Sequence, residues 1–221
     1  PDAFSADATL NKIYTFIFNF NYDTTPFWYL YMLVGLYLIM PVFNAWLKSA
    51  PRADIKLFLK LWGVSLLLPL VNIAAPLLGY TGNYGNMGLW GVCDWNTFGT
   101  FYYLSGFIGY IVLAHYLVRY SLDWSWGKVA AIGVPMFVAG YAVTFGGYLV
   151  MQEYYPGNYA YLEIMWLFTS INVFMMTFPV FVTVRKIGFR PSAFISALAR
   201  LTFGIYLCHF FVVQVMYDVY N

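Results

Sequence analysis

The chain has 221 residues, of which 62% are hydrophobic, 23% are aromatic and only 9% are charged, and its formal net charge is +2. Because a soluble domain carries roughly 25% charged residues, this composition excludes a water-soluble globular protein. So small a net charge gives no indication of a nucleic-acid partner, and the distribution of the charges along the chain is more informative than their sum.

The N-terminal segment, residues 1–26, contains a short amphipathic stretch. Ile13, Phe16, Ile17 and Phe20 recur at the i, i+3, i+4 and i+7 spacing that places side chains on one face of a helix. This pattern predicts either a short helix lying in the interface on the outer side of a membrane or the end of a further spanning helix. The chain begins with Pro, without an initiator Met or a cleavable signal pattern, so we expect it to be part of something longer.

The rest of the chain contains long segments without any Asp, Glu, Lys or Arg: 61–93, 95–118, 129–152 and 164–184. A helix needs about 20 apolar residues to cross a hydrocarbon layer about 30 Å thick, and each of these segments is long enough. We therefore predict an all-α, polytopic transmembrane helix bundle over residues 27–221. Its membrane helices, about six in number, are expected at 27–47, 55–78, 98–118, 128–151, 161–184 and 193–217.

The basic residues predict the orientation of these helices. The segments that hold ten of the eleven Lys and Arg occupy every second connection: 48–60, 119–128 and 185–200. The other two connections, 79–97 and 152–160, contain no basic residue. By the positive-inside rule, the three basic segments face the cytoplasm and both ends of the chain lie outside.

The first basic segment has two interpretations. It places four cations beside the membrane: Lys48, Arg52, Lys56 and Lys60. Such a cluster could hold the phosphate groups of a cytosolic cofactor, or it could serve only the positive-inside bias.

A second pair of alternatives concerns the outer loop 79–97, which carries Tyr80, Tyr84, Trp90 and Trp95. It is either a pliable loop folded over the bundle or a set of flat apolar faces against which sugar rings lie.

Motifs of soluble enzymes are absent from the sequence, which has no GxSxG, P-loop or HExxH. Two His and two Cys, far apart in the chain, do not predict a metal site. His209 lies in the run 201–217, which has no formal charge. An ionisable residue inside a membrane helix is a functional candidate, although a neutral imidazole bonded to a backbone or hydroxyl group would have only a structural role.

Two further ionisable residues have structural interpretations. His115 stands four residues before Arg119 at the cytoplasmic end of its predicted helix, where it can extend to the interface or bind a helix-terminal carbonyl. Glu163 stands at the outer start of the predicted helix 161–184. A carboxylate there complements the helix dipole, and general-base chemistry is the less favoured alternative.

Three segments resemble the acyltransferase-3 family of membrane proteins. FWYLYMLVGLYLIMP at 27–41 is similar to a family helix of the form WFLY-x-L-x-GLYL-x-x-P. FYYLSGFIGYIVL at 101–113 resembles the family's F-x-x-G-Y-x-L helix, and FGIYLCHFFV at 203–212 resembles its C-terminal Y-G-I-Y-L-x-H helix. The three segments occur in the family's order over most of the chain.

The resemblance implies a bundle of about ten helices that transfers acyl groups, commonly acetyl, from a cytosolic acyl-CoA to hydroxyls of cell-envelope glycans or lipid-linked sugars. It also implies a multi-pass protein of the bacterial inner membrane. The family's principal catalytic His belongs to an Arg-x10-His helix that no position of this sequence matches, so the chain corresponds to the C-terminal part of such a domain. His209 occupies the family's second His position.

Roles for individual residues follow from the resemblance and the charge pattern together. His209 is expected to orient the substrate or to stabilise the developing oxyanion. The expected acyl-CoA ligands are Lys48, Arg52, Lys56 and Arg185. The expected acceptor-binding residues are Tyr84, Trp90, Trp95 and Glu163, and no metal is expected.

The alternative is a non-enzymatic membrane bundle, such as a transporter or a polysaccharide export component. A transporter should contain a dense polar pathway near the membrane midplane or an internal repeat. The first three and last three predicted helices show no convincing repeat, which favours the acyltransferase.

Overall fold

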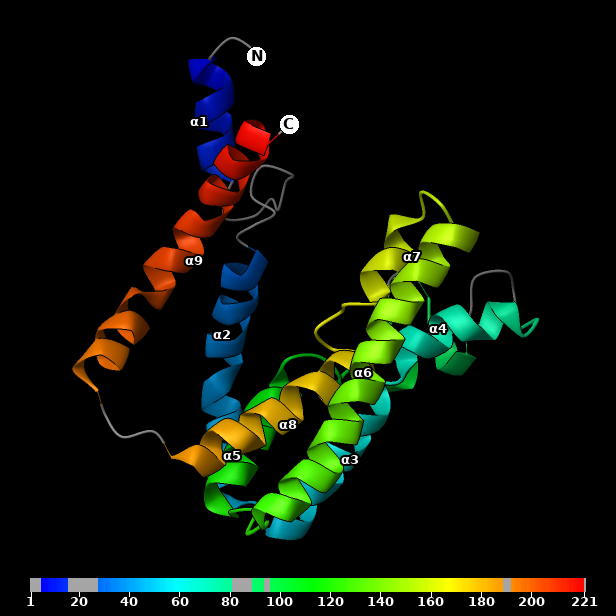
Figure 1. Cartoon of the computed structure of the whole chain (residues 1–221), viewed down its shortest axis with the longest axis vertical. Coiled ribbons are helices and arrows are strands. Elements are labelled where there is room, and N and C mark those ends of the chain that lie inside the picture. The colour runs from blue at the N-terminus through cyan, green and yellow to red at the C-terminus, as the bar shows by residue number, and fades with distance from the viewer. Residues whose placement is uncertain (1–4, 16–27, 81–88, 94–95, 189–191, 221) are drawn as a thin grey trace. The chain divides into compact units, whose positions relative to one another are not determined.

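The computed structural model describes residues 5–15, 28–80, 89–93, 96–188 and 192–220 (Figure 1). Within these ranges the regular structure is helical, apart from an isolated bridge between Cys93 and Asn96. The predicted all-α class is confirmed. In chain order the elements are α1 (Ala6–Thr15), α2 (Trp28–Ser49), α3 (Arg52–Ser65), α4 (Leu68–Leu77), η2 (Leu89–Gly91), η3 (Gly99–Phe101), α5 (Ile108–Arg119), α6 (Trp126–Tyr154), α7 (Tyr159–Ile164), α8 (Ile171–Ile187) and α9 (Ala193–Tyr220).

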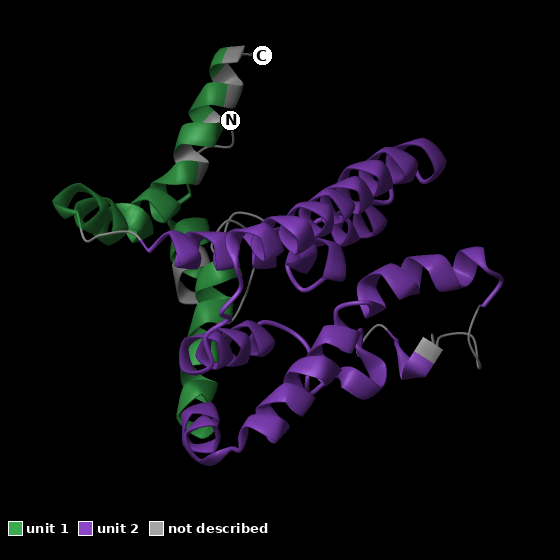
Figure 2. Cartoon of the chain, turned by 60° about the horizontal axis from the view of Figure 1, so that its bottom comes forward, with its two compact units in different colours: residues 1–42, 190–221 green, residues 43–189 purple. Residues whose placement is uncertain are grey.

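The chain divides into two compact units (Figure 2). Unit 1 comprises residues 1–42 and 190–221, and unit 2 comprises residues 43–189. Helix α2 begins in unit 1 and ends in unit 2, whereas α9 belongs to unit 1 and α3 to α8 belong to unit 2. The predicted division at residue 26 stays a prediction.

Among the described residues, three helices are long and apolar enough to cross a membrane: Trp28–Ser49, Arg52–Leu77 and Trp126–Tyr154. Ile108–Arg119 and Ala193–His209 are shorter apolar helices. The chain is therefore an integral membrane protein. The first, fourth and sixth predicted helices are each continuous, as α2, α6 and α9. Helix α1 includes Ile13 of the predicted amphipathic stretch, while residues 16–20 lie outside the described residues, so that helix stays a prediction.

The second, third and fifth predicted helices are interrupted. Two residues separate α3 from α4, and residues 165–170 separate α7 from α8. In the third, the continuous helix starts at Ile108 and not at residue 98, after a turn in which Gly106 has φ +83°. The second predicted helix is confirmed as a candidate membrane span, Arg52–Leu77, despite its two-residue interruption. The expectation of an uninterrupted helix is wrong for the third and the fifth, where long-range contacts satisfy the backbone.

Hydrogen bonds between distant segments hold the interruptions together. The Ile171 amide donates to the Leu66 carbonyl at 2.8 Å, which joins the start of α8 to the break between α3 and α4. Trp62 Nε1 donates to the Gly106 carbonyl at 2.9 Å, and the Tyr110 hydroxyl donates to the Phe168 carbonyl at 2.7 Å. Non-helical backbone at membrane depth persists only where such partners or a cavity satisfy it.

Asn172 fixes the break between α7 and α8 against α6. This side chain is fully buried, accepts a bond from Ser170 Oγ at 2.6 Å, and donates to Thr144 Oγ1 at 2.9 Å and to the Met165 carbonyl at 2.7 Å. A Cβ added at Gly140 would lie 2.5 Å from the Asn172 carbonyl oxygen. Glycine at this position therefore lets α6 approach α8 closely.

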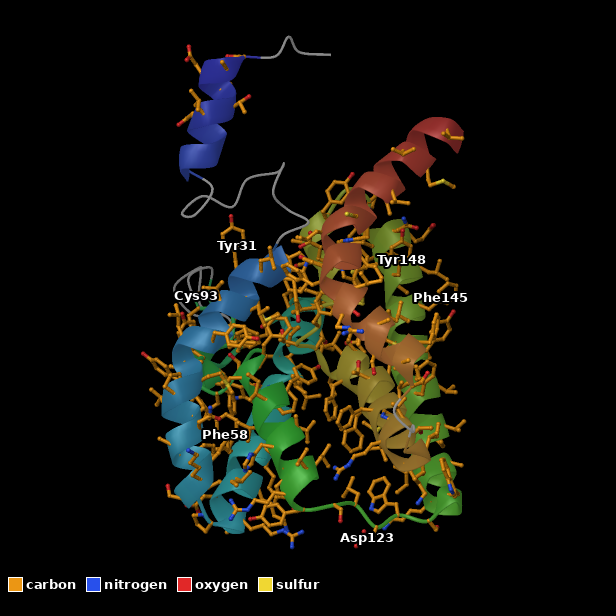
Figure 3. All side chains as sticks on the ribbon, turned by 90° about the vertical axis from the view of Figure 1, so that its left-hand side faces the viewer. Tyr31, Phe58, Cys93, Asp123, Phe145 and Tyr148 are labelled. Carbon is orange, nitrogen blue, oxygen red and sulfur yellow. The ribbon has the colours of Figure 1, made fainter. Side chains whose placement is uncertain are left out.

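One part of the apolar core of unit 2 packs α3 against α5. Trp62 is buried, and its ring meets Tyr110 at 4.9 Å and Phe174 at 5.5 Å between centroids. A second cluster contains Leu47, Ala50, Ile55 and Val112, with rings such as Phe58 packed against it (Figure 3). These contacts position the C-terminal end of α5.

Candidate functional site

The C-terminal end of α5 gathers arginines from three parts of the chain. Arg119 is the last residue of the helix, and its Nη1 donates to the Leu47 carbonyl at 3.3 Å. Arg185, from the last turn of α8, donates from Nη1 to the Leu117 carbonyl. Cations are stabilised at a helix C-terminus because unpaired carbonyls and the helix dipole give it negative partial charge.

Arg52 reaches the same end of α5 through aromatic rings. Its Nε donates to the Tyr116 hydroxyl at 3.2 Å, and its guanidinium carbon lies 4.7 Å from the ring centroid of Tyr120. Tyr116 and Tyr120 are four residues apart, so they share one face of the chain as it leaves the helix, with ring centroids 5.0 Å apart. The face of an aromatic ring attracts a cation, and the two rings hold Arg52 in place.

Of the four residues predicted to bind a cofactor, the structure brings Arg52 and Arg185 to one helix end. Lys48 is exposed in the last turn of α2, next to Leu47, whose carbonyl Arg119 binds. Lys56 is exposed on α3. Arg119 and the tyrosine pair also belong to this cluster, and neither was predicted from the sequence. The signal that could have found them is a pair of tyrosines four residues apart, three residues before and one residue after the basic helix end at Arg119.

These cations are not neutralised by carboxylates within the described part of the chain, where their partners are carbonyls, a hydroxyl and rings. Asp123, in the connection between α5 and α6, accepts a bond from Ser121 Oγ at 3.2 Å (Figure 3). A small cavity of about 160 Å³ beside this connection is lined in part by Arg185 and Lys186. The cluster is therefore suited to an anionic ligand.

The other end of α6 carries a larger and chemically different cavity. Its volume is about 790 Å³, and it is lined by residues 149–159 and Leu162. Gln152 Nε2 donates to the Tyr148 hydroxyl at 3.0 Å, and the rings of Tyr155 and Tyr161 meet edge to face at 5.4 Å. Amides, tyrosines and Glu153 suit a neutral ligand rich in hydroxyl groups. The run EYYPGNY at 153–159, between two apolar segments, is the signal that could have predicted it.

The residues predicted to bind an acceptor are only partly described. Tyr84 and Trp95 lie outside the described residues. Trp90 is exposed in η2, its ring meets Phe101 at 6.0 Å, and its carbonyl accepts a bond from Thr100 Oγ1 at 3.3 Å. Glu163 is exposed one residue before the end of α7. The interpretation of Glu163 as a residue at a helix start is wrong, because a short separate helix places it near a C-terminal end.

His209 lies on α9 in unit 1, and its side chain is exposed. Its ring stacks on Tyr206 at 5.4 Å, and its Nδ1 is hydrogen-bonded to the Tyr206 carbonyl. Tyr206 in turn meets the ring of Tyr29 at 5.3 Å. A carbonyl only accepts, so Nδ1 carries the proton, and a neutral His209 presents Nε2 as a hydrogen-bond acceptor.

His115 lies on α5, four residues before Arg119. Its Nε2 is buried and has no hydrogen-bond partner among the described residues. The predicted bond to a helix-terminal carbonyl is therefore not made by this nitrogen, and the two structural roles predicted for the residue stay predictions. A buried polar atom without a partner costs about 1–3 kcal/mol.

Comparison with protein families identifies the chain. The family model of the acyltransferase-3 acyltransferase domain matches residues 2–221. The chain belongs to the acyltransferase-3 family. No curated protein and no solved structure matches it.

As an acyltransferase-3 protein, the chain is an integral membrane enzyme of acyl transfer. The resemblance seen in three segments is confirmed, and those segments fall on α2, on η3 with α5, and on α9. Membership favours the enzyme over the non-enzymatic bundle. An acyltransferase-3 enzyme needs a donor site and an acceptor site, and the two ends of α6 provide two chemically distinct candidates.

Proposed function

We propose that this enzyme transfers an acetyl group from a cytosolic acyl-CoA to a hydroxyl of a cell-envelope glycan or lipid-linked sugar. The observation that carries the proposal is the cluster of Arg52, Arg119 and Arg185 around the end of α5, which has no carboxylate partner among the described residues. Coenzyme A carries phosphate groups, and the planar guanidinium binds phosphate through paired hydrogen bonds. Residues of the basic segments lie on the cytoplasmic side in the predicted topology.

Donor binding is assigned to Lys48, Arg52, Lys56 and Arg185, with Arg119 added. Arg52 and Arg119 both contact the ring of Tyr120, with guanidinium carbons 4.7 and 5.6 Å from its centroid. Each arginine uses one N–H donor to bind a carbonyl or hydroxyl oxygen, and a guanidinium has five N–H donors. Donors therefore remain for phosphate oxygens.

Acceptor binding is assigned to the aromatic residues of the opposite connections: Tyr84, Trp90 and Trp95, with Glu163. The cavity lined by residues 149–159 adds tyrosine faces, amide groups and the Glu153 carboxylate. Aromatic faces pack against the apolar faces of sugar rings, while amides and carboxylates pair with sugar hydroxyls. This chemistry supports a glycan or lipid-linked sugar as acceptor.

The reaction forms one ester bond and breaks one thioester bond. The acceptor oxygen attacks the thioester carbonyl carbon as a base removes its proton, and the coenzyme A thiol leaves with a proton. Family likeness assigns that base to the Arg-x10-His helix. A neutral His209 with Nε2 as acceptor is suited to hold the acceptor hydroxyl in line for attack. Oxyanion stabilisation, the other predicted role, would require the protonated ring.

The direct test is acetyl transfer by the purified full-length protein, with its Arg-x10-His helix, in lipid nanodiscs. Isotopically labelled acetyl-CoA is supplied on one side with a polyprenyl-linked sugar or soluble glycan, and the product is identified by mass spectrometry. We expect acetylated acceptor, and weaker donor binding in Arg52→Gln with unchanged folding. If the folded chain binds no acyl-CoA in equilibrium dialysis, the donor assignment is wrong.

A further inference from the structure

A shallow apolar groove runs between α6 and α8 within unit 2. Its volume is about 400 Å³, and its lining is Trp126, Val129, Ala130, Gly133, Val134, Phe137, Val138, Pro179, Val180, Thr183 and Val184. A single hydroxyl, that of Thr183, is present among these side chains, and it donates to the Pro179 carbonyl at 2.8 Å. The groove thus offers almost no hydrogen bond to a ligand and requires an apolar one.

The groove has the dimensions of one lipid chain. On α6 it extends from Trp126 to Val138, which at 1.5 Å per residue is about 18 Å and so roughly one leaflet of the hydrocarbon layer. Its floor is where the helices meet, because a Cβ at Gly133 would lie 3.2 Å from Pro179 Cβ. Its walls are open: Val134 is 60% exposed and Val180 is 50% exposed.

Two ammonium groups lie at the Trp126 end of the groove. Lys186 Nζ donates to the Trp124 carbonyl at 2.6 Å and lies 5.2 Å from the ring centroid of Trp126. Lys128 Nζ lies 5.0 Å from the ring centroid of Trp124. Among the described residues neither lysine has a carboxylate partner, and the neighbouring Asp123 is bonded to Ser121. One end of the apolar groove is therefore cationic and flanked by tryptophans, as at a membrane interface.

We propose that this groove binds an anionic phospholipid of the cytoplasmic leaflet. One acyl chain lies between α6 and α8, and the headgroup phosphate pairs with Lys128 and Lys186. The charge complementarity at the Trp126 end selects an anionic headgroup, since that leaflet is rich in anionic lipid and basic pockets between helices bind such headgroups. The bound lipid is neither donor nor acceptor in the reaction.

The headgroup assignment is tested by native mass spectrometry of the full chain, titrated with phosphatidylglycerol or with phosphatidylcholine of the same acyl chains. We expect preferential binding of phosphatidylglycerol, weakened about tenfold in Lys128→Gln/Lys186→Gln. The matched control, Lys56→Gln/Lys60→Gln, also removes two exposed positive charges, from α3, and neither residue lines the groove. Equal binding of the two lipids, or equal loss in the control, overturns the proposal.

The chain-binding part is tested by filling the groove. Ala130 lines it, whereas its neighbour Ala131 is equally exposed but does not. Ala130→Phe should reduce phosphatidylglycerol binding severalfold, and Ala131→Phe should not. Unchanged lipid binding in a folded Ala130→Phe variant overturns the groove as the lipid site. A variant that gains or loses oligomerisation with no change in lipid binding also overturns it, because the occupant of the groove would then be a helix of another protein.

A last measurement separates the lipid from the proposed donor. Coenzyme A is added to the complex of the chain with phosphatidylglycerol. We expect no displacement, because Arg52 and Arg119 contact the end of α5 and do not line the groove. Competitive displacement would assign Lys128 and Lys186 to the acyl donor and overturn the lipid assignment. Because lipid binding is measured without any reaction, this result is independent of whether the chain acetylates a glycan.

Discussion

The two ends of α6 are built from different chemistry. Its first turns carry Lys128 and lie beside Lys186 and Arg185, whose partners are carbonyls and rings. Its last turns lie beside tyrosines, amides and Glu153 around a cavity of about 790 Å³. A cation that is not neutralised suits a phosphate, while a cavity rich in tyrosine suits a neutral polyhydroxylated ligand. The difference shows that one helix can connect two candidate binding regions of opposite character.

Between these ends, α6 is continuous while its neighbours are interrupted. Thr144 of α6 accepts a hydrogen bond from Asn172, which also fixes the break between α7 and α8. In the proposed reaction, the thioester of the donor and the hydroxyl of the acceptor have to meet between the two ends of α6. Irregular backbone satisfied by side chains is expected there, since such segments occur where membrane proteins bind or pass substrates.

Cysteine labelling gives an all-or-none result that would decide whether the two ends of α6 face opposite sides of the membrane. With Cys93 and Cys208 replaced by Ser, a cysteine is introduced at Ser49 or at Tyr159. We expect a membrane-impermeant thiol reagent to label Tyr159→Cys in intact cells, and Ser49→Cys only after permeabilisation, because basic connections stay inside. The reverse pattern, or labelling of both from outside, would contradict the predicted topology.

The next largest effect concerns His209, which belongs to neither end. His209→Ala should lower acetyl transfer by about 10- to 1000-fold, equivalent to about 1.4–4 kcal/mol, if the ring orients the acceptor hydroxyl. Cys208→Ala, the adjacent exposed position on α9, is the control and should act like wild type. Wild-type transfer by His209→Ala at matched protein abundance would leave the residue with only a structural role.

The middle region is tested by Asn172→Leu. The change leaves the Met165 carbonyl and the Ser170 hydroxyl buried without their partner, so we expect a loss of about 2–4 kcal/mol in the free energy of unfolding. Thermal unfolding in detergent measures it. Thr177→Val on the same helix removes only a bond to its own backbone at Val173 and should change little. Equal stability of the two variants would mean that the network does not hold the break.

The basic end is tested by Lys48→Gln/Arg52→Gln. We expect the apparent Michaelis constant for acyl-CoA to rise about tenfold, or about 1.4 kcal/mol, while that for the acceptor stays constant. Lys60→Gln, exposed on the same helix as Arg52, controls for loss of surface charge. If donor dependence is unchanged in a normally inserted protein, these residues serve only membrane orientation.

The smallest effect is expected at the tyrosine-rich end. Tyr159 is exposed and lines the large cavity, and its replacement by Ala should raise the Michaelis constant for the acceptor about threefold to tenfold without affecting the donor. Tyr141→Ala removes an exposed tyrosine of α6 that stacks on Phe145 and lies outside this cavity. If Tyr159→Ala changed only the Michaelis constant for the donor, the donor would be assigned to this end of α6 and the acceptor to the other.

The sequence by itself determined the class of the protein, its family and its continuous spans. Residues 27–47, 128–151 and 193–217 were predicted as helices; α2 covers 28–47, and α6 and α9 cover the other two ranges. These predictions succeed because the length of an apolar run against the thickness of a membrane is a local property of the chain. The spacing of basic residues is equally local, and it located Arg52 and Arg185 as candidates.

Only the tertiary structure decided where helices break and which side chains meet. The break before α8 depends on a bond between Ile171 and Leu66, and the turn before α5 depends on Trp62, so neither could be read from its own segment. The placement of Arg52 on the Tyr116 ring joins positions 64 residues apart. In a membrane every backbone group needs a partner, and which distant group supplies it is determined by packing and not by local hydrophobicity.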